Sequence, residues 1–113
     1  MCSNSVLNKV VNQVADESAK LFGDKLKNVI LFGSYARGDQ DDESDIDVMI
    51  MVDIPQDELT GYRKQISHIC SDINIENCVF ISPILQSLNT FNIYKDALPF
   101  FKNVANEGIS YYG

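Results

Sequence analysis

Hydrophobic residues recur at helical spacing along the first part of the chain. Between residues 4 and 22 they fall on one side of a helix, and polar residues fall on the other. Gly23 follows directly, at a position where glycine commonly ends a helix. The pattern therefore predicts a first helix at about residues 4–22, whose apolar side carries Val6, Val10, Val11, Val14 and Leu21.

Short runs rich in β-forming residues come next. They predict strands near residues 27–32 and 46–52, and Pro55 ends the second of them. A helix at about residues 56–71 is expected to follow, and then a third strand near residues 75–81. The inward residues predicted for this second helix are Leu59, Ile66, Ile69 and Cys70.

The last third of the chain has a less regular pattern. Ser87 is a candidate cap for a short helix that runs to Phe91, and Pro99 fits the first turn of another helix. Residues 109–112 predict a final strand. Because no repeat, low-complexity stretch or linker interrupts the chain, we expect one domain over residues 1–113 with a single sheet and helices.

A glycine and a serine stand at the end of the first predicted strand. Gly33 has no Cβ, so its backbone can approach an anion closely. Ser34 can donate a hydroxyl hydrogen bond and cap a short helical turn at residues 35–37, where free backbone N–H groups favour phosphate. A Gly-Ser turn alone is usually only a turn, so its meaning depends on what lies beside it.

Two aspartates alternate with apolar residues where the second predicted strand begins. The spacing of Asp45 and Asp47 places both carboxylates on one face of a strand, opposite Ile46 and Val48. Two carboxylates about 5 Å apart repel by about 3 kcal/mol at an effective dielectric constant of ~20, so such a pair would shift a pKa, stay well solvated or bind a cation. Mg²⁺ suits such oxygen ligands and also bridges substrate phosphates. With the Gly-Ser turn, the pair indicates metal-assisted nucleotidyl transfer, in which Asp45 and Asp47 are metal ligands and catalytic residues.

The acidic run between these two features has a plainer explanation. Residues 39–43 are expected to form a solvated loop whose carboxylates serve solubility rather than catalysis. A calcium-binding EF-hand loop is excluded, because a loop that starts at Asp39 or Asp41 has no glycine at its sixth position and no glutamate at its twelfth. The conjunction of turn and carboxylate pair therefore carries the functional hypothesis.

The segment from Gly33 to Ile50 reads GSYARGDQDDESDIDVMI. It resembles the signature of minimal nucleotidyltransferases in the DNA polymerase beta superfamily, in which Gly-Ser is followed several residues later by an Asp-x-Asp pair. Residues 98–109 are similar to the tail of bacterial members, so the resemblance covers nearly the whole chain. It implies an α/β (α+β) chain with a polymerase-beta-like nucleotidyltransferase fold, a single small mixed sheet flanked by helices.

The resemblance also implies roles for individual residues. Gly33 and Ser34 are expected to contact nucleotide phosphates, and Asp45 and Asp47 to hold Mg²⁺. Arg37 is expected to help neutralise phosphate charge. For Arg37 an ion pair with the neighbouring acidic loop or with a partner protein is an equal alternative, because mixed-charge loops readily form exposed ion pairs.

A third carboxylate of the family is missing from its expected place. On the strand predicted at residues 75–81, Cys78 stands where an aspartate is expected, and a thiol is a poor magnesium ligand. Glu76 lies on the same face, but two strand residues span about 6.7 Å and the extra methylene of glutamate does not bridge that distance. We therefore expect nucleotide and metal to bind while transfer is slow or lost.

The same family implies a protein partner. Minimal nucleotidyltransferases resemble the antitoxin half of two-gene systems whose other half is a HEPN-domain ribonuclease, to which the enzyme half transfers AMP. The chain is thus expected to use ATP or another nucleoside triphosphate and to modify a hydroxyl, most simply on such a partner. Two alternatives stay open: a non-catalytic subunit that neutralises its partner by binding, and a structural domain without either ligand.

Composition and charge narrow the possible partners. A chain of 113 residues with 45% hydrophobic content fits one domain with a modest core, and no segment approaches the ~20 apolar residues of a membrane span. Without a charged leader and apolar run at the N-terminus, a cytoplasmic location is expected. The net charge of −7 argues against a broad nucleic-acid surface, which needs clustered basic residues.

The remaining reactive and aromatic side chains suggest no further chemistry. Cys2, Cys70 and Cys78 form no metal-binding spacing, so we expect reduced thiols, with Cys70 and Cys78 buried as small hydrophobic residues. His68 has no nucleophile nearby in sequence and is expected at the surface or partly packed. The aromatic residues expected in cores or interfaces are Phe91, Tyr94, Phe100, Phe101, Tyr111 and Tyr112.

Overall fold

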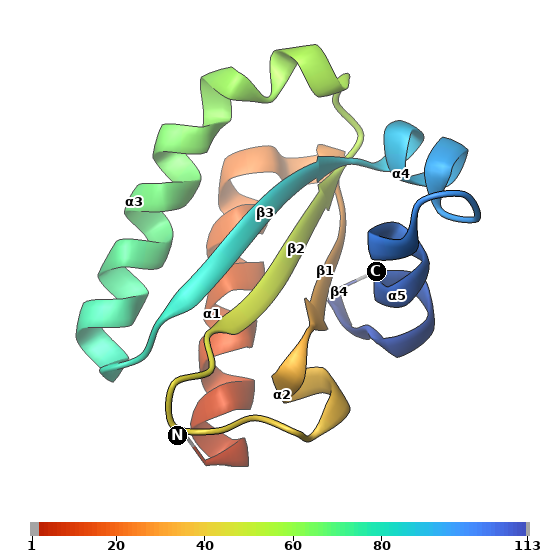
Figure 1. Ribbon diagram of the computed structural model, residues 1–113. Coiled ribbons are helices and arrows are strands. Elements are labelled where there is room, and N and C mark those ends of the chain that lie inside the picture. The colour runs from red at the N-terminus through yellow and green to blue at the C-terminus, as the bar shows by residue number, and fades with distance from the viewer. Residues whose placement is uncertain (1–2, 113) are drawn as a thin grey trace.

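The computed structural model describes residues 3–112, so Cys2 lies outside the described residues. Within this range, four strands form one sheet in the order β3-β2-β1-β4 (Figure 1). The strands are β1 (Leu26–Phe32), β2 (Ile46–Val52), β3 (Ile81–Ser87) and β4 (Ile109–Tyr112). The helices are α1 (Asn4–Phe22), α2 (Ser34–Arg37), α3 (Thr60–Asn77), α4 (Leu88–Tyr94) and α5 (Pro99–Glu107), with 3-10 turns at Gly23–Lys25 and Gln56–Glu58.

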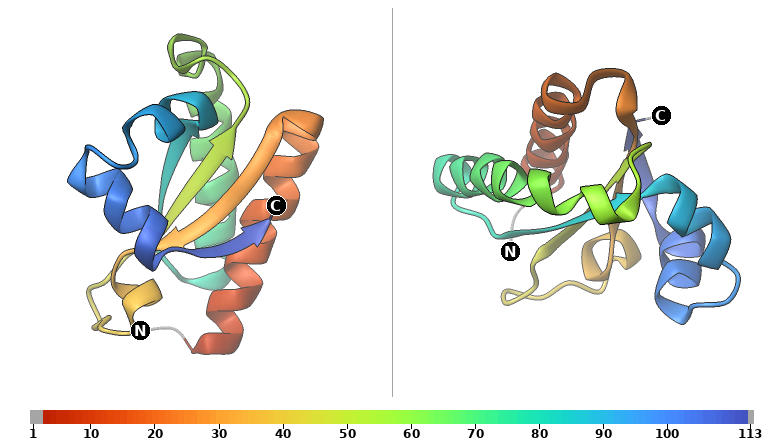
Figure 2. Two further views of the ribbon diagram at one scale, coloured as in Figure 1. Left: turned by 90° about the vertical axis from the view of Figure 1, so that its right-hand side faces the viewer. Right: turned by 90° about the horizontal axis from the view of Figure 1, so that it is seen from above.

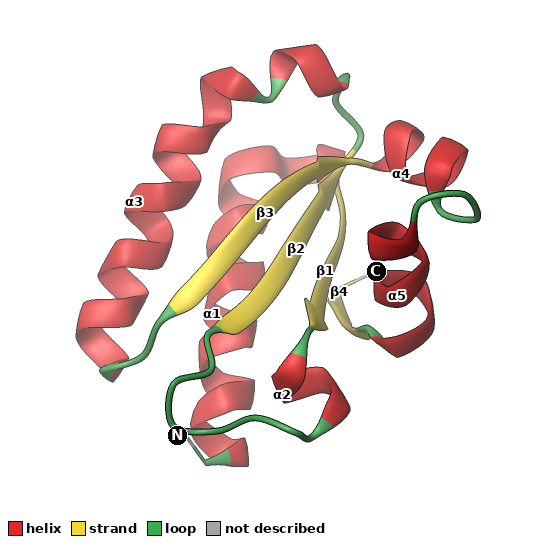
Figure 3. Cartoon of the chain, in the orientation of Figure 1, coloured by secondary structure: helices red, strands yellow, loops and turns green. Residues whose placement is uncertain are grey.

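The sheet is mixed. Strand β1 pairs antiparallel with both β2 and β4, whereas β2 pairs parallel with β3 (Figure 3). The parallel connection from β2 to β3 runs through α3, as a parallel crossover requires. The predicted α+β class, a small mixed sheet flanked by helices, is confirmed.

Helices cover both faces of the sheet, with α1 and α3 on one face and α4 and α5 on the other (Figure 2). The larger core lies under α1 and α3 and includes the alternate β2 residues Ile46, Val48, Ile50 and Val52. The smaller core lies under α4 and α5 and contains Phe32, Met49, Met51, Phe91 and Val104. Alternation along β2 therefore assigns its side chains to two cores, and Asp47 shares the face of the smaller one.

The first helix forms as its pattern predicts. The Ser3 side chain accepts a hydrogen bond of 3.3 Å from the backbone N–H of Val6, which caps the N-terminus of α1. Gly23 ends the helix with φ 56°, and its N–H donates to the Ala19 carbonyl. Pro99 begins α5, and β4 follows, so both of these predictions are confirmed as well.

The third predicted strand is wrong by about six residues. Residues 75–77 still belong to α3, and β3 begins only at Ile81. The apolar residues Ile66, Cys70 and Ile73 continue the buried side of the helix, and Pro83 lies inside β3 rather than after it. Proline is tolerated there because β3 is an edge strand.

The asparagine side chains at the end of α3 explain the turn that separates helix from strand. The amide of Asn77 donates to the Ile73 carbonyl at 2.9 Å, and the Asn74 side-chain oxygen accepts from the backbone N–H of Ile81 at 2.8 Å. Cys78 follows α3 with φ 55°, a left-handed conformation. Local hydrogen bonds to side chains thus end the helix where a strand was expected to be already under way.

The reactive side chains behave differently from one another. Cys70 is buried, as predicted, and its burial raises the pKa of the thiol to about 11. Cys78 is exposed, so the prediction of burial is wrong for this residue. His68 is exposed as predicted, with Nε2 3.6 Å from the Asp72 carboxylate. Among the described residues 3–112, no helix has the length and apolarity needed to cross a bilayer.

Candidate functional site

A tight turn links β1 to the short helix α2. Gly33 adopts φ 76° and ψ −155°, a region that is essentially restricted to glycine. Its carbonyl accepts hydrogen bonds from the backbone N–H groups of Ala36 and Arg37, each at 3.1 Å. Ser34 was expected to cap this turn through its side chain, but the N-cap position belongs to Gly33 and no side-chain capping bond forms.

The same glycine lies against one of the two aspartates. In the antiparallel pairing of β1 with β2, Phe32 stands opposite Asp47, so the turn after β1 approaches the carboxylate. A Cβ atom on Gly33 would collide with the Asp47 carboxylate oxygen. Only a residue without a side chain therefore allows the backbone of the turn to lie this close to the carboxylate.

Asp47 lies in β2, and Asp45 lies directly before this strand. Ser82 of β3 is the register partner of Asp47, and its hydroxyl donates a 3.1 Å hydrogen bond to Asp45. Partial burial and then the negative charge of Asp45 raise the pKa of the Asp47 carboxyl, which the positive charge of Arg37 opposes. The structure therefore brings the two predicted carboxylates close enough to repel each other.

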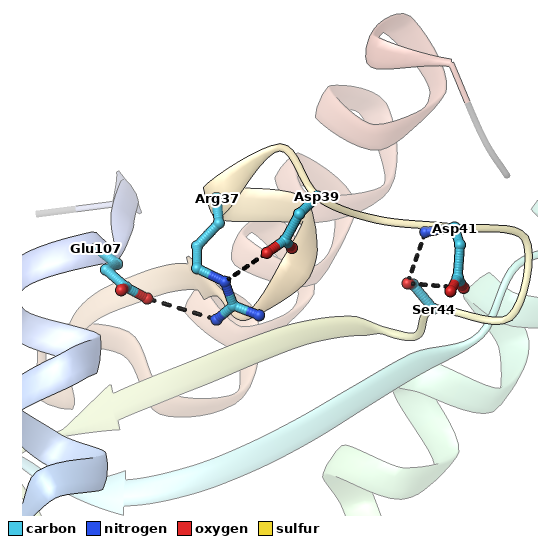
Figure 4. Close-up of polar contacts among 5 residues, drawn as sticks. All are labelled: Arg37, Asp39, Asp41, Ser44 and Glu107. Atoms are coloured by element: carbon cyan, nitrogen blue, oxygen red, sulfur yellow. Dashed lines mark hydrogen bonds and ion pairs between the residues drawn. The ribbon is translucent and has the colours of Figure 1, made fainter.

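Arg37 lies beside this pair but is engaged elsewhere. Its Nε donates to the Asp39 carboxylate at 3.1 Å, and its Nη1 donates to Glu107 of α5 at 3.4 Å (Figure 4). These hydrogen bonds and charges, with Asp39 first, raise the pKa of the guanidinium above its usual value. The alternative interpretation, an ion pair with the acidic loop, is thus what the structure contains.

The acidic loop itself is organised by its own side chains. The Asp41 carboxylate accepts hydrogen bonds from the Ser44 hydroxyl at 3.2 Å and from the backbone N–H of Glu43 at 2.9 Å. The Ser44 hydroxyl oxygen in turn accepts from the backbone N–H of Asp41 at 2.9 Å (Figure 4). These contacts shape an exposed turn, as expected of a loop rather than of a metal site.

A cavity of about 330 Å³ opens over the turn. One wall consists of residues predicted from the sequence, and the other belongs to α5, whose side chains no sequence motif connects with the site. The lining residues are Phe32, Gly33, Ser34, Arg37, Asp47, Phe100, Asn103, Val104 and Glu107. The α5 members are spaced i, i+3, i+4 and i+7, a helical signal that marks one side of α5 but does not reveal what that side faces.

A second cavity, of about 690 Å³, borders the acidic loop and is lined by Asp45, Cys78 and Phe80 among others. Cys78 therefore does not stand in a strand beside Asp47, and the predicted placement is wrong. Ser82 occupies the position next to the pair, and β3 contains no acidic residue. Within residues 3–112, no group of three or more His, Cys, Asp or Glu side chains is arranged to hold a metal ion.

Replacing Gly33 by alanine is expected to damage the turn. The Gly33→Ala chain should lose about 1–3 kcal/mol of unfolding free energy, because alanine is strained at this backbone conformation and its Cβ displaces the Asp47 carboxylate. Gly61→Ala is the matched control, since it lies in α3 with open space around its Cβ and should be neutral or stabilising. Urea denaturation of both variants measures the difference, and equal stabilities would contradict the argument.

Asp47 should make the fold less stable as the pH rises. Its pKa is raised in the folded chain, so the protonated form is favoured there, and its contribution is fully present below the unfolded pKa of about 3.9. That contribution is lost as the pH climbs through the raised pKa. Without divalent cations, Asp47→Asn should therefore gain stability relative to the unmodified chain between pH 3 and 7, as followed by denaturation midpoints. Asp57→Asn, at an exposed site, is the control, and a flat difference for Asp47→Asn would refute the prediction.

Comparison with known families places this geometry in context. The family model described as "Nucleotidyltransferase domain" matches residues 11–102. A Methanocaldococcus jannaschii protein named "Putative protein adenylyltransferase MJ0141" is 36% identical over 104 residues, with 89% of this chain and 94% of the relative covered. A second protein of the same organism, named "Putative protein adenylyltransferase MJ0604", is 33% identical over 100 residues, with 88% of this chain and 92% of the relative covered.

Solved structures share the fold at low sequence identity. A crystal structure of "a putative nucleotidyltransferase from Sulfolobus solfataricus" superposes with a TM-score of 0.64 at 22% identity, with 93% of this chain and 78% of that chain covered. A mutant of the toxin–antitoxin MntA-HpeT superposes with a TM-score of 0.57 at 17% identity, with 95% of this chain and 73% of that chain covered. The family match over most of the chain agrees with the fold and with the resemblance of its motif. The chain belongs to the nucleotidyltransferase domain family.

Proposed function

We propose that this chain transfers AMP from ATP to a hydroxyl group on a partner protein, with Mg²⁺ held by Asp45 and Asp47. The observation that carries this proposal is the position of the Asp47 carboxylate against Gly33. It brings the turn at Gly33 and Asp47 together in the lining of one cavity, and Asp45 stands two residues before Asp47, where it lines the neighbouring larger cavity.

The donor set fits a hard divalent cation. Asp45 and Asp47 offer carboxylate oxygens, and the charge of Asp45 contributes to the raised pKa of Asp47. A cation between them would remove this repulsion, since Mg²⁺ prefers oxygen ligands and completes its shell with water and phosphate oxygens. When bound, it would neutralise charge on the triphosphate and on the departing pyrophosphate.

The turn and Arg37 bind and orient the phosphates in this proposal. Gly33 lets the backbone approach them, and Ser34 and Arg37 line the same cavity with a hydroxyl and a positive charge. Exposed ion pairs such as those of Arg37 with Asp39 and Glu107 are screened by solvent and contribute little to stability. A phosphate group can therefore replace a carboxylate on the guanidinium.

The reaction is an in-line substitution at phosphorus. The oxygen of the acceptor hydroxyl forms a bond to the α-phosphorus of ATP, and the bond from that phosphorus to the β-phosphate oxygen breaks. Pyrophosphate leaves, the hydroxyl proton passes to solvent, and the acceptor retains AMP as a phosphodiester. The chain contributes chiefly by positioning the reactants and by charge stabilisation, which dominate catalysis of phosphoryl and nucleotidyl transfer.

The proposed acceptor is a partner of the HEPN class. The names of the Methanocaldococcus relatives and the toxin–antitoxin assignment of a structural neighbour support an acceptor that is a protein. The net charge of −7 favours a basic partner surface and speeds its association.

One observation favours a second function. Strand β3 contains no acidic residue, and Ser82 stands beside the carboxylate pair where the family is expected to use a third carboxylate. A site with two carboxylates supports a subunit that binds nucleotide and partner but transfers AMP slowly or not at all.

Labelled ATP distinguishes the two functions. The chain, co-purified with the product of its neighbouring gene, is incubated with Mg²⁺ and ATP labelled at the α-phosphate. Transfer predicts label on the partner, and Asp47→Ala should lower the labelling rate by at least about 10²-fold because it removes a catalytic carboxylate. Asp57→Ala, at an exposed site outside the cavity, should leave the rate unchanged. Absence of label with intact nucleotide binding would favour the non-catalytic subunit, and absence of both would overturn the proposal.

Adding a carboxylate to β3 tests whether the absence of an acidic residue there limits AMP transfer. Ser82→Asp adds an acidic group beside Asp47, and it should raise the labelling rate, by up to about 10²-fold, if the missing third carboxylate limits transfer. Ser82→Asn controls for the change of size, and Cys78→Asp places the same charge outside the strand. Equal rates in all three variants would show that the β3 position does not limit transfer.

A further inference from the structure

Helix α5 forms a wall of the cavity that faces the phosphate-binding turn. Phe100, Asn103, Val104 and Glu107 lie on one side of this helix and all line the cavity. Val104 is buried and anchors the helix in the smaller core. The other three present an aromatic ring, an amide and a carboxylate, and the Glu107 carboxylate is already paired with Arg37.

The ring of Phe100 lies close to the turn. Its centroid is 5.5 Å from that of Phe32, the residue directly before Gly33, and the two rings meet edge to face at 79°. Phe100 nevertheless stays 43% exposed. The neighbouring Phe101 has a different environment, since it is partly buried and packs on Phe91 of α4 at 5.2 Å. Phe101 therefore holds α5 in place, whereas Phe100 keeps an accessible aromatic surface beside the phosphate-binding turn.

The cavity suits the remainder of a nucleotide whose phosphates lie at the turn. Beyond its phosphates, a nucleoside triphosphate has a polar ribose and a planar base, which together need an apolar surface and a few polar partners. The volume of about 330 Å³ lies at the lower end of small-molecule sites. Bases stack readily on aromatic side chains, and an amide can both donate to and accept from a ribose or a base edge.

The larger cavity is a poorer place for this group. It is bordered by Asp42, Glu43 and Asp45 and has no lysine or arginine in its lining, so a polyphosphate would meet negative charge there. The α5 cavity is also lined by two carboxylates, Asp47 and Glu107, but it has the guanidinium of Arg37 beside them. Electrostatics thus favours the α5 side for the nucleotide.

We propose that α5 forms the nucleoside subsite, with Phe100 as the stacking surface for the base and Asn103 as a hydrogen-bonding partner of the ribose or base. The subsite rests on the proposed function, because it extends from the phosphates bound at Gly33 and Ser34. Since every base has an aromatic face, Phe100 strengthens the binding of nucleoside triphosphates in general, and any preference among bases depends on Asn103.

Binding at the nucleoside subsite can be measured apart from binding at the phosphate site by comparing two ligands. Isothermal titration calorimetry is carried out with ATP and with inorganic tripolyphosphate, both in Mg²⁺, because tripolyphosphate occupies only the phosphate part. Phe100→Ala should raise the dissociation constant for ATP about 5- to 150-fold and leave that for tripolyphosphate unchanged. Asn103→Ala should raise the ATP value about 2- to 10-fold.

Matched variants guard against a loss of structure. Phe100→Leu keeps an apolar side chain on Phe32 but has no aromatic plane, so it should weaken ATP binding, whereas Phe100→Trp should keep it. Ile93→Ala, at a 63% exposed position on α4 outside the cavity, should bind both ligands normally.

Each other outcome overturns the subsite. Unchanged ATP affinity in Phe100→Ala would show that the base does not stack there, and an equal loss for both ligands would show that Phe100 only supports the fold of the turn. If the unmodified chain binds neither ligand, the proposed function fails and the subsite fails with it. If it binds both ligands with the same affinity, the nucleoside makes no contact and only the subsite is refuted.

Discussion

The approach of the Asp47 carboxylate to Gly33 is the constraint on which the site depends. It requires a glycine in a conformation closed to other residues and a register in which Phe32 faces Asp47. A slip of one residue in that register would turn Asp47 into the larger core and Val48 toward the site. The burial of Ile46 and Val48 under α1 and α3 prevents this slip, because it would expose them and bury a carboxylate. The hydrophobic core thus fixes the geometry of the turn at Gly33.

The site carries an electrostatic cost that the rest of the chain does not remove. Asp47 is partly buried beside Asp45, and the positive charge of Arg37 only partly offsets the resulting rise in its pKa. Arg37 divides its hydrogen bonds between Asp39 and Glu107 instead of pairing with the aspartates. In the proposed function, a bound cation would reduce the repulsion between the aspartates, and the nucleotide phosphates would engage the arginine. Such strain is typical of sites that are completed by their ligand.

Local patterns predicted the elements that depend on neighbouring residues. Helix α1 and strands β1 and β2 followed from periodicity. Strand β3 did not, for two reasons. Pro83 suggested the end of a strand, whereas an edge position tolerates it. The buried side of α3 continues to Ile73, and the hydrogen bonds of the Asn74 and Asn77 side chains end the helix only after it. Because the strand was predicted too early, Cys78 was expected in it, whereas Cys78 directly follows α3. The position beside Asp47 belongs to Ser82, and only the pairing of β2 with β3 reveals this.

The α5 wall was hidden from the sequence for a different reason. Phe100 and Phe32 lie far apart along the chain, and an aromatic residue on an amphipathic helix gives no sign of whether its ring fills a core or borders a cavity. The answer depends on how α5 docks. Gly108, directly after the helix, packs against Ile30 so closely that a Cβ would clash, and β4 then pairs with β1. Because β1 also leads into Gly33, one strand positions both walls of the cavity: its end sets the turn, and its outer edge holds the segment that carries α5. The distance between the turn at Gly33 and the ring of Phe100 is therefore fixed by the sheet rather than by either loop, which the proposed nucleotide site requires.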